Sequence, residues 1–249
     1  MRKLGIPYEH IYNGELLLVN DRHPLHQMPG KRWLVPACNG YSDILLHKRA
    51  AAQLQQLIQN IHAQETIVPV SGFREYEEQV EIYEDCMRTE GIGYTTDFVA
   101  LPGCSEHHTG LAIDVAEKKQ KIDFICPEFP YEGICQTFRE KASGYGFIER
   151  YQRGKEAVTH VAQEPWHFRY VGIPHAHIIK EKDLTLEEYI QYVKQFTQSG
   201  EHLIYESQDI RYEIFYIPLQ EEGYEFYLEE EKRCIVSGNN IDGVIVNIW

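Results

Sequence analysis

Hydrophobic residues in the segment 42–61 recur at the three- and four-residue spacing of a helix that buries one face. The apolar stripe consists of Leu45, Ala52, Leu54, Leu57, Ile58 and Ile61. We expect Ser42 to cap this helix, because a serine side chain accepts hydrogen bonds from the free N–H groups of a first turn. Further helices are predicted over residues 75–91, 131–146 and 183–196.

Strands are predicted where hydrophobic and polar positions alternate. In the segment 111–116, Ala112 and Asp114 point to one side, and Ile113 and Val115 point to the other. This pattern is typical of a strand with one buried face. Other strands are predicted over residues 66–74, 147–151, 158–163 and 166–172. The region 202–249 contains several short β-type runs separated by Gly, Pro and Asn–Asn.

Thr197 to Gly200, with the sequence TQSG, has the composition of a hinge. We therefore expect a main domain over residues 1–196 and a small β-rich extension over residues 197–249. The mixture of helices and separate short strands predicts an α+β fold with an antiparallel sheet. Helices are expected to pack against one face of that sheet.

Composition and charge exclude several functions. The 249 residues carry 24 basic and 38 acidic side chains, a net charge of −14 without a basic stripe, so no nucleic-acid partner is expected. No apolar run is long enough for a membrane span, and the N-terminus lacks the apolar core of a signal peptide. Six cysteines without a CxxC pair are typical of reduced thiols, and we expect a cytoplasmic protein. The sequence does not reveal the oligomeric state.

The segment SEHHTGLAID, residues 105–114, contains side chains that could bind a metal ion. His107 and Asp114 are seven residues apart with Gly110 between them, so a turn followed by a strand could bring both to one cation. Histidine nitrogen and carboxylate oxygen are common zinc ligands. On spacing alone, His108 is also a candidate.

The segment EPWHFRY, residues 164–170, offers a third ligand. Its aromatic side chains alternate with polar ones, so His167 and Arg169 share the face opposite the packed aromatic rings. Pro165 favours an extended conformation for Glu164. Glu164 could then lie over the metal as a base, and His167 could complete a set of three ligands with one coordination position open.

Three motifs give the chain a resemblance to a known family. SEHHTGLAID fits Ser-x-His-x-x-Gly-x-Ala-x-Asp, EPWH fits Glu-x-x-His, and SGFR, residues 71–74, lies upstream. Together they resemble the zinc D,D-peptidases of the VanX/VanY group, which cleave D-Ala-D-Ala, and most of all the VanXY type. The likeness covers roughly residues 20–196.

The resemblance implies one Zn²⁺ per chain, on the sheet face opposite the helices, with His107, Asp114 and His167 as ligands. His108 falls on a variable position of the motif, so we interpret it as a neighbour that supports the site. The resemblance further implies catalytic roles for Glu164 as base and Arg74 as oxyanion partner, and a contact of Ser105 with the substrate carboxylate. Gln79, one and a half helical turns after Arg74, is a second candidate for contact with substrate.

The activity implied by the resemblance is hydrolysis of small peptides that end in D-Ala-D-Ala. The enzyme would act as dipeptidase and carboxypeptidase and support glycopeptide (vancomycin) resistance. One alternative is an endopeptidase that cleaves L-Ala–D-Glu in peptidoglycan on the same scaffold. Another is a catalytically inactive, zinc-stabilised binding module, against which the presence of Glu164 argues.

Overall fold

The structure is a computed structural model that describes residues 1–207 and 210–249. The chain forms two compact units: a larger unit, Val19–Thr185, and a smaller unit, which joins Met1–Leu18 to Leu186–Trp249. No helix in the described ranges is both long and apolar enough to cross a membrane.

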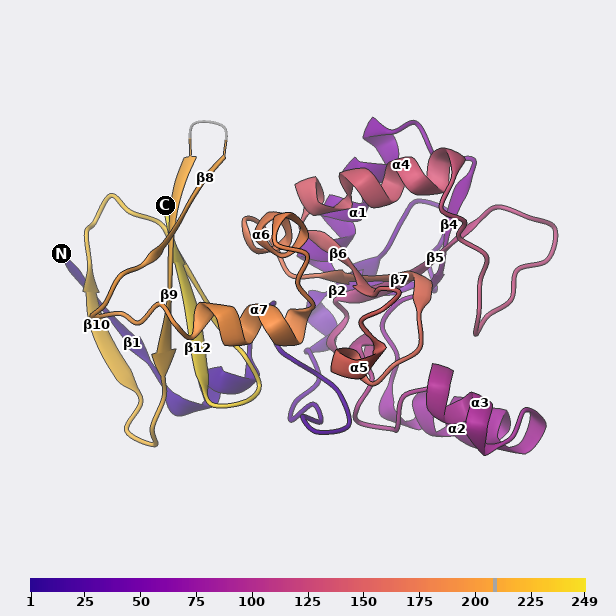
Figure 1. The fold of residues 1–249 in the computed structure, drawn as a ribbon, viewed down its shortest axis with the longest axis horizontal. Coiled ribbons are helices and arrows are strands. Elements are labelled where there is room, and N and C mark those ends of the chain that lie inside the picture. Colours follow the sequence, from indigo (N-terminus) through magenta and orange to yellow (C-terminus); the bar gives the residue numbers. More distant parts are fainter. Residues whose placement is uncertain (208–209) are drawn as a thin grey trace. The chain divides into compact units, whose positions relative to one another are not determined.

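The larger unit contains a mixture of helices and antiparallel strands (Figure 1). Its helices are α1 (Lys48–Asn60), α2 (Tyr76–Thr89), α3 (Ile92–Phe98), α4 (Gly133–Ala142), α5 (Glu156–Thr159) and α6 (His175–Glu181). Its strands are β2 (Leu34–Pro36), β3 (Leu45–His47), β4 (Ile67–Ser71), β5 (Ala112–Glu117), β6 (Phe147–Tyr151) and β7 (Glu164–Tyr170). The expected α+β class is confirmed.

A four-stranded antiparallel sheet with the order β4-β5-β7-β6 forms the centre of this unit. Helices α1 and α4 pack on one face of the sheet, and α2 and α3 lie on the other side (Figure 1). The alternation predicted for β5 is present, because Ile113 and Val115 belong to the core under α1 and α4. Asp114 therefore points to the opposite face, where it pairs directly with His167 of β7.

Two predicted elements of the larger unit are wrong in extent or type. The helix expected over 42–61 begins only at Lys48, because Leu45–His47 pairs as β3 with β2. Ser42 consequently does not cap the helix, and its hydroxyl donates instead to the carboxylate of Asp43 at 3.1 Å. The strand expected over 158–163 is not formed, since this segment begins inside α5.

The smaller unit is mainly β-structure with its own apolar core. It contains α7 (Leu186–Val193), β1 (Arg2–Ile6), β8 (Leu203–Ser207), β9 (Ile210–Pro218), β10 (Tyr224–Leu228), β11 (Cys234–Gly238) and β12 (Gly243–Ile248). One sheet has the order β11-β12-β9-β8, and β1 pairs with β10 in another. The division differs from the expected extension over 197–249, because β1 and α7 belong to this unit as well.

Candidate metal centre and active site

Three side chains that are distant in the sequence meet on the face of the sheet opposite α1 and α4. Asp114 and His167 are direct cross-strand neighbours, and His107 lies on the 3-10 helix Glu106–Thr109 that leads into β5. Asp114 Oδ2 lies 3.1 Å from His107 Nε2, and Asp114 Oδ1 lies 2.9 Å from His167 Nδ1. One donor atom from each residue lies within 4.8 Å of the others, and all three are buried.

The local sequence explains how His107 reaches this point. The Ser105 hydroxyl caps the 3-10 helix by accepting from the backbone N–H of His107 at 3.3 Å. The helix ends at Gly110, which has a positive φ of 68°. A Cβ atom at Gly110 would lie 2.9 Å from Leu34 Cδ2, so the turn needs glycine both for its conformation and for space.

Hydrogen bonds behind the two imidazole rings leave one nitrogen of each facing Asp114. His107 Nδ1 donates to the carbonyl of Gly72 at 2.7 Å, which leaves Nε2 as a lone-pair donor. His167 Nε2 lies 3.4 Å from a carboxylate oxygen of Glu106, which leaves Nδ1 toward Asp114. The two ring centroids are 5.1 Å apart in an edge-to-face arrangement.

The donor set fits a divalent cation. Asp114 Oδ1 is fully buried and has no hydrogen-bond partner in the described parts of the chain, although His167 Nδ1 is only 2.9 Å away. A buried acceptor of this kind is costly unless another group satisfies it. Two imidazole nitrogens and a carboxylate are a common set of protein ligands for catalytic zinc, so the group could hold a metal ion.

Electrostatics at the group favour ionised Asp114. Burial alone would raise the pKa of Asp114, but His107 and His167 outweigh this effect and hold it below its usual range. Burial alone would lower the pKa of His167, but Asp114 and Glu106 raise it to about 10. A metal ion binds neutral imidazole and would take over this stabilising role beside the carboxylate.

Glu164, the predicted base, lies at the start of β7 beside the ligand group. Its Oε2 is 3.6 Å from His167 Nδ1, and its side chain is buried. Burial raises the pKa of Glu164 to about 8; the positive charge of His167 opposes the shift, and Asp114 and Glu106 add to it. A carboxylate that accepts a proton near neutral pH has the property that a general base requires.

Arg74 follows β4, and two side-chain hydrogen bonds hold its guanidinium group in place. Its guanidinium donates from Nη1 to Gln79 Oε1 and from Nη2 to the Ser71 hydroxyl, both at 2.7 Å. Gln79 is fully buried, and its own amide donates to the carbonyl of Ala100 at 2.7 Å. Gln79 therefore supports Arg74 and is not among the described residues that line the cavity, while its contact with substrate stays a prediction.

A cavity of about 90 Å³ opens in front of the group. Its polar lining combines the predicted residues Arg74, Ser105, His107, Asp114, Glu164 and His167. Its apolar lining includes Phe98, Val99, Phe124, Ile125, Val161 and Trp166. A few convergent polar groups within an apolar wall are typical of a site for a small ligand.

His108, which spacing alone left open as a ligand, is directed away from the group. Its Nδ1 donates to the carbonyl of Arg74 at 2.8 Å, and its Nε2 accepts from the backbone N–H of Gly103 at 3.1 Å. Both ring nitrogens are therefore used to join the Arg74 loop to the turn before Ser105. The interpretation of His108 as a supporting neighbour agrees with this geometry.

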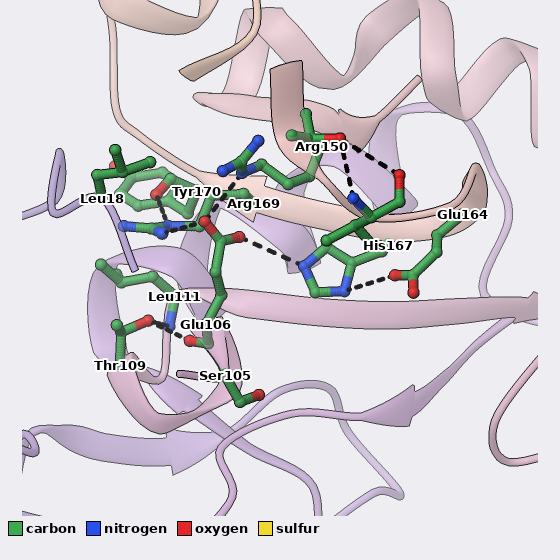
Figure 2. A network of polar contacts seen from close by, with 12 residues as sticks. Leu18, Ser105, Glu106, Thr109, Leu111, Arg150, Glu164, His167, Arg169 and Tyr170 are labelled. Atoms are coloured by element: carbon green, nitrogen blue, oxygen red, sulfur yellow. Dashed lines mark hydrogen bonds and ion pairs between the residues drawn. The ribbon is translucent and has the colours of Figure 1, made fainter. Parts of the chain in front are cut away.

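The sequence reasoning missed a buried ionic cluster behind His167. Glu106 forms ion pairs with Arg150 and Arg169, and the three side chains have no exposed surface (Figure 2). One signal for it was present, because Arg169 falls on the same face of the predicted strand as His167. Nothing in the spacing pointed to Glu106 or Arg150.

An α+β fold that buries a His–Asp–His group beside a carboxyl base is typical of metallopeptidases. The VanY family model, described as D-alanyl-D-alanine carboxypeptidase, matches residues 43–173. The chain is 42% identical over 181 residues to the bifunctional D-Ala-D-Ala dipeptidase and D-Ala-D-Ala carboxypeptidase VanXYC of Enterococcus gallinarum, which covers 72% of this chain and 95% of that protein. The chain belongs to the VanY family of peptidases, which confirms the expected resemblance and the expectation of an enzyme.

Solved structures extend the similarity to the whole chain. The vancomycin resistance D,D-dipeptidase VanXYg, in complex with a D-Ala-D-Ala phosphinate analogue, is 43% identical, with a TM-score of 0.96 over 100% of this chain and 98% of that one. A mutant of the D,D-pentapeptidase VanY from a VanB-type resistance cassette, in complex with Zn(II), is 30% identical. Its TM-score is 0.54 over 71% of this chain and 98% of that one.

Proposed function

We propose that the chain is a zinc-dependent D,D-peptidase. It hydrolyses free D-Ala-D-Ala and removes the C-terminal D-Ala from peptidoglycan precursors, and in this way supports resistance to glycopeptide antibiotics. The observation that carries the proposal is the buried group of His107, Asp114 and His167 with Glu164 beside it in one cavity. Similarity to VanXYC and VanXYg supports the choice of substrate.

The proposal assigns one Zn²⁺ per chain to His107 Nε2, Asp114 and His167 Nδ1. When bound, such a cation acts as a Lewis acid that makes water more acidic and polarises a carbonyl group. The protein contributes the geometry of the donors, because the carbonyl of Gly72 fixes the His107 ring from behind and strand pairing places Asp114 beside His167. The cavity supplies the space in which the scissile peptide lies.

Glu164 moves the proton in the proposed reaction. Its carboxylate takes a proton from the attacking water and then donates it to the leaving amine of the terminal D-alanine. The cation would lower the pKa of Glu164 from its value of about 8 toward the range in which the carboxylate is ionised at neutral pH. Burial keeps this side chain away from bulk water, so the proton is available for the leaving group.

Arg74 and Ser105 complete the assignment. Arg74 carries a fixed positive charge at the cavity and, with Gln79 and Ser71 holding it, stabilises the negative oxygen that develops on the substrate carbonyl. Ser105 uses its oxygen to cap the 3-10 helix, and its O–H can donate to the substrate carboxylate. A cytoplasmic location, where precursors would be met, is part of the proposal and is checked by cell fractionation.

Purified protein incubated with three substrates tests the proposal. We expect release of D-alanine from D-Ala-D-Ala and from a pentapeptide precursor, and no cleavage of a muropeptide at L-Ala–D-Glu. Cleavage of the muropeptide alone would instead support the endopeptidase. Glu164→Ala is the control for a binding module: it should keep zinc and lose hydrolysis, and unchanged hydrolysis would refute the assignment of the base.

A further inference from the structure

Glu106 lies in a buried position for which the proposed chemistry has no direct use. It precedes His107 in the 3-10 helix, and its side chain has no exposed surface. Its Oε1 accepts from Arg150 Nε at 2.9 Å and from Arg169 Nη1 at 2.8 Å. Its Oε2 faces His167 Nε2 at 3.4 Å (Figure 2). Asp114 lies at the other ring nitrogen, with Oδ1 2.9 Å from His167 Nδ1.

Burying three charged side chains is costly, and apolar residues of similar volume often stabilise a fold equally well. Stability alone therefore does not explain why Glu106, Arg150 and Arg169 are buried together. The position of the cluster behind His167 suggests that it serves the metal site. The two arginines engage Oε1 and hold the carboxylate in place, so Oε2 meets the imidazole at a fixed position. Strand pairing fixes His167 opposite Asp114, but it leaves the rotation of the ring to its contacts.

We infer that Glu106 is a positioning residue for the metal centre: it accepts a hydrogen bond from His167 Nε2–H and so presents Nδ1 to the metal. Arg150 and Arg169 anchor Glu106 for this role. The inference rests on the proposed zinc site. A carboxylate behind an imidazole ligand fixes its tautomer and makes the ring a stronger electron-pair donor.

The two ligand histidines have different hydrogen-bond acceptors behind their rings. Behind His107 lies a neutral acceptor, the carbonyl of Gly72, at 2.7 Å. Behind His167 lies a carboxylate whose second oxygen is engaged by two guanidinium groups. Removing the charge of Glu106 should therefore weaken metal binding through His167, the ligand that its carboxylate faces.

Glu106→Gln tests the inference, because it keeps the shape and an acceptor oxygen but removes the charge. Glu149→Gln is the matched control: Glu149 is half-buried and also paired with an arginine, Arg139, at 2.7 Å, but it lies on β6 and contacts Tyr131 rather than a ligand. Zinc affinity is measured by competition with a chelating dye. The visible spectrum of the Co²⁺-substituted proteins reports the ligand geometry independently of activity.

We expect Glu106→Gln to bind zinc about 10- to 100-fold more weakly than the parent and to shift the Co²⁺ spectrum. Glu149→Gln should stay within about threefold of the parent. A folded Glu106→Gln protein with parental zinc affinity and spectrum would overturn the inference. If the parent itself bound no zinc, the proposed function would fall, and the inference with it.

A measurement on the parent protein covers the case in which Glu106→Gln does not fold. Long-range proton–nitrogen NMR spectra of the zinc-loaded parent identify the protonated nitrogen of each ligand histidine. The inference requires His167 to carry its proton on Nε2 and His107 on Nδ1. A spectrum in which His167 is protonated on Nδ1, or lacks a proton on Nε2, would overturn it.

Discussion

Replacing Glu164 by glutamine should stabilise the metal-free protein at alkaline pH. Glu164 is a buried acid whose pKa is raised to about 8, chiefly by burial. In the unfolded chain the same carboxyl ionises near its usual value of 4.5. Between these two values the folded state binds more protons than the unfolded state, so the free energy of unfolding falls as the pH rises from about 4.5 to 8.

The size of this effect follows from the two pKa values. The difference between 4.5 and about 8, at about 1.4 kcal/mol per pKa unit, gives at most about 5 kcal/mol, reached above the folded-state value. Below pH 4.5 the contribution vanishes, because the carboxyl is protonated in both states. Glutamine removes the ionisable group, so Glu164→Gln should exceed the parent in stability increasingly from pH 5 to pH 8.

Urea unfolding of both proteins with excess chelator, at several values between pH 5 and pH 8.5, measures the difference. Glu84→Gln is the control, because Glu84 is an exposed glutamate on α2. Adding zinc should shrink the difference, since a nearby cation stabilises the ionised carboxylate. Equal stability of Glu164→Gln and the parent across this range would refute the reasoning about the site's electrostatics.

Three further substitutions test separate parts of the account. Asp114→Asn should lower zinc content after dialysis and abolish hydrolysis, because the ligand loses its charge; parental zinc content would contradict it. Arg74→Met should reduce kcat about 10²- to 10³-fold at unchanged zinc content, as expected for loss of an oxyanion partner; a parental kcat would contradict this. Gly110→Ala should lower the free energy of unfolding by about 1–3 kcal/mol in urea, given its φ of 68° and the 2.9 Å approach to Leu34; an unchanged midpoint would be inconsistent.

Local sequence patterns predicted the helices and strands whose conformation is decided by their own residues. The alternation of residues 111–116 gave the correct faces of β5, and helix α2 lies within the predicted 75–91. The start of α1 was wrong because Leu45–His47 satisfies a helical spacing, yet these residues pair with Leu34–Pro36. Pairing with a strand about ten residues away decides the conformation there, and periodicity does not reveal it.

In the smaller unit, too, the sequence pattern does not reveal which strands pair, here over a larger separation along the chain. The short strands after residue 202 were predicted, but the pairing of Arg2–Ile6 with Tyr224–Leu228 was not. Residues at opposite ends of the chain form this pair, and no local pattern connects them. The expected boundary between residues 196 and 197 therefore differs from the boundaries of the two compact units.

Within the site, motif spacing and family resemblance found the residues that meet in the cavity. The supporting residues were harder to recognise, because Glu106 is 44 residues from Arg150 and 63 from Arg169. Helical spacing gives Gln79 its approximate position and makes it a candidate for contact with substrate. The spacing does not reveal that its amide holds Arg74 and the carbonyl of Ala100, because that contact depends on the loop before Ser105.

The central claim is that one cation held by His107, Asp114 and His167 is required for hydrolysis of D-Ala-D-Ala. Titration of chelator-treated protein with Zn²⁺, while D-alanine release is followed, tests it most directly. The account predicts no activity without metal and a linear rise that ends at one equivalent per chain. Full activity in the metal-free protein would contradict it.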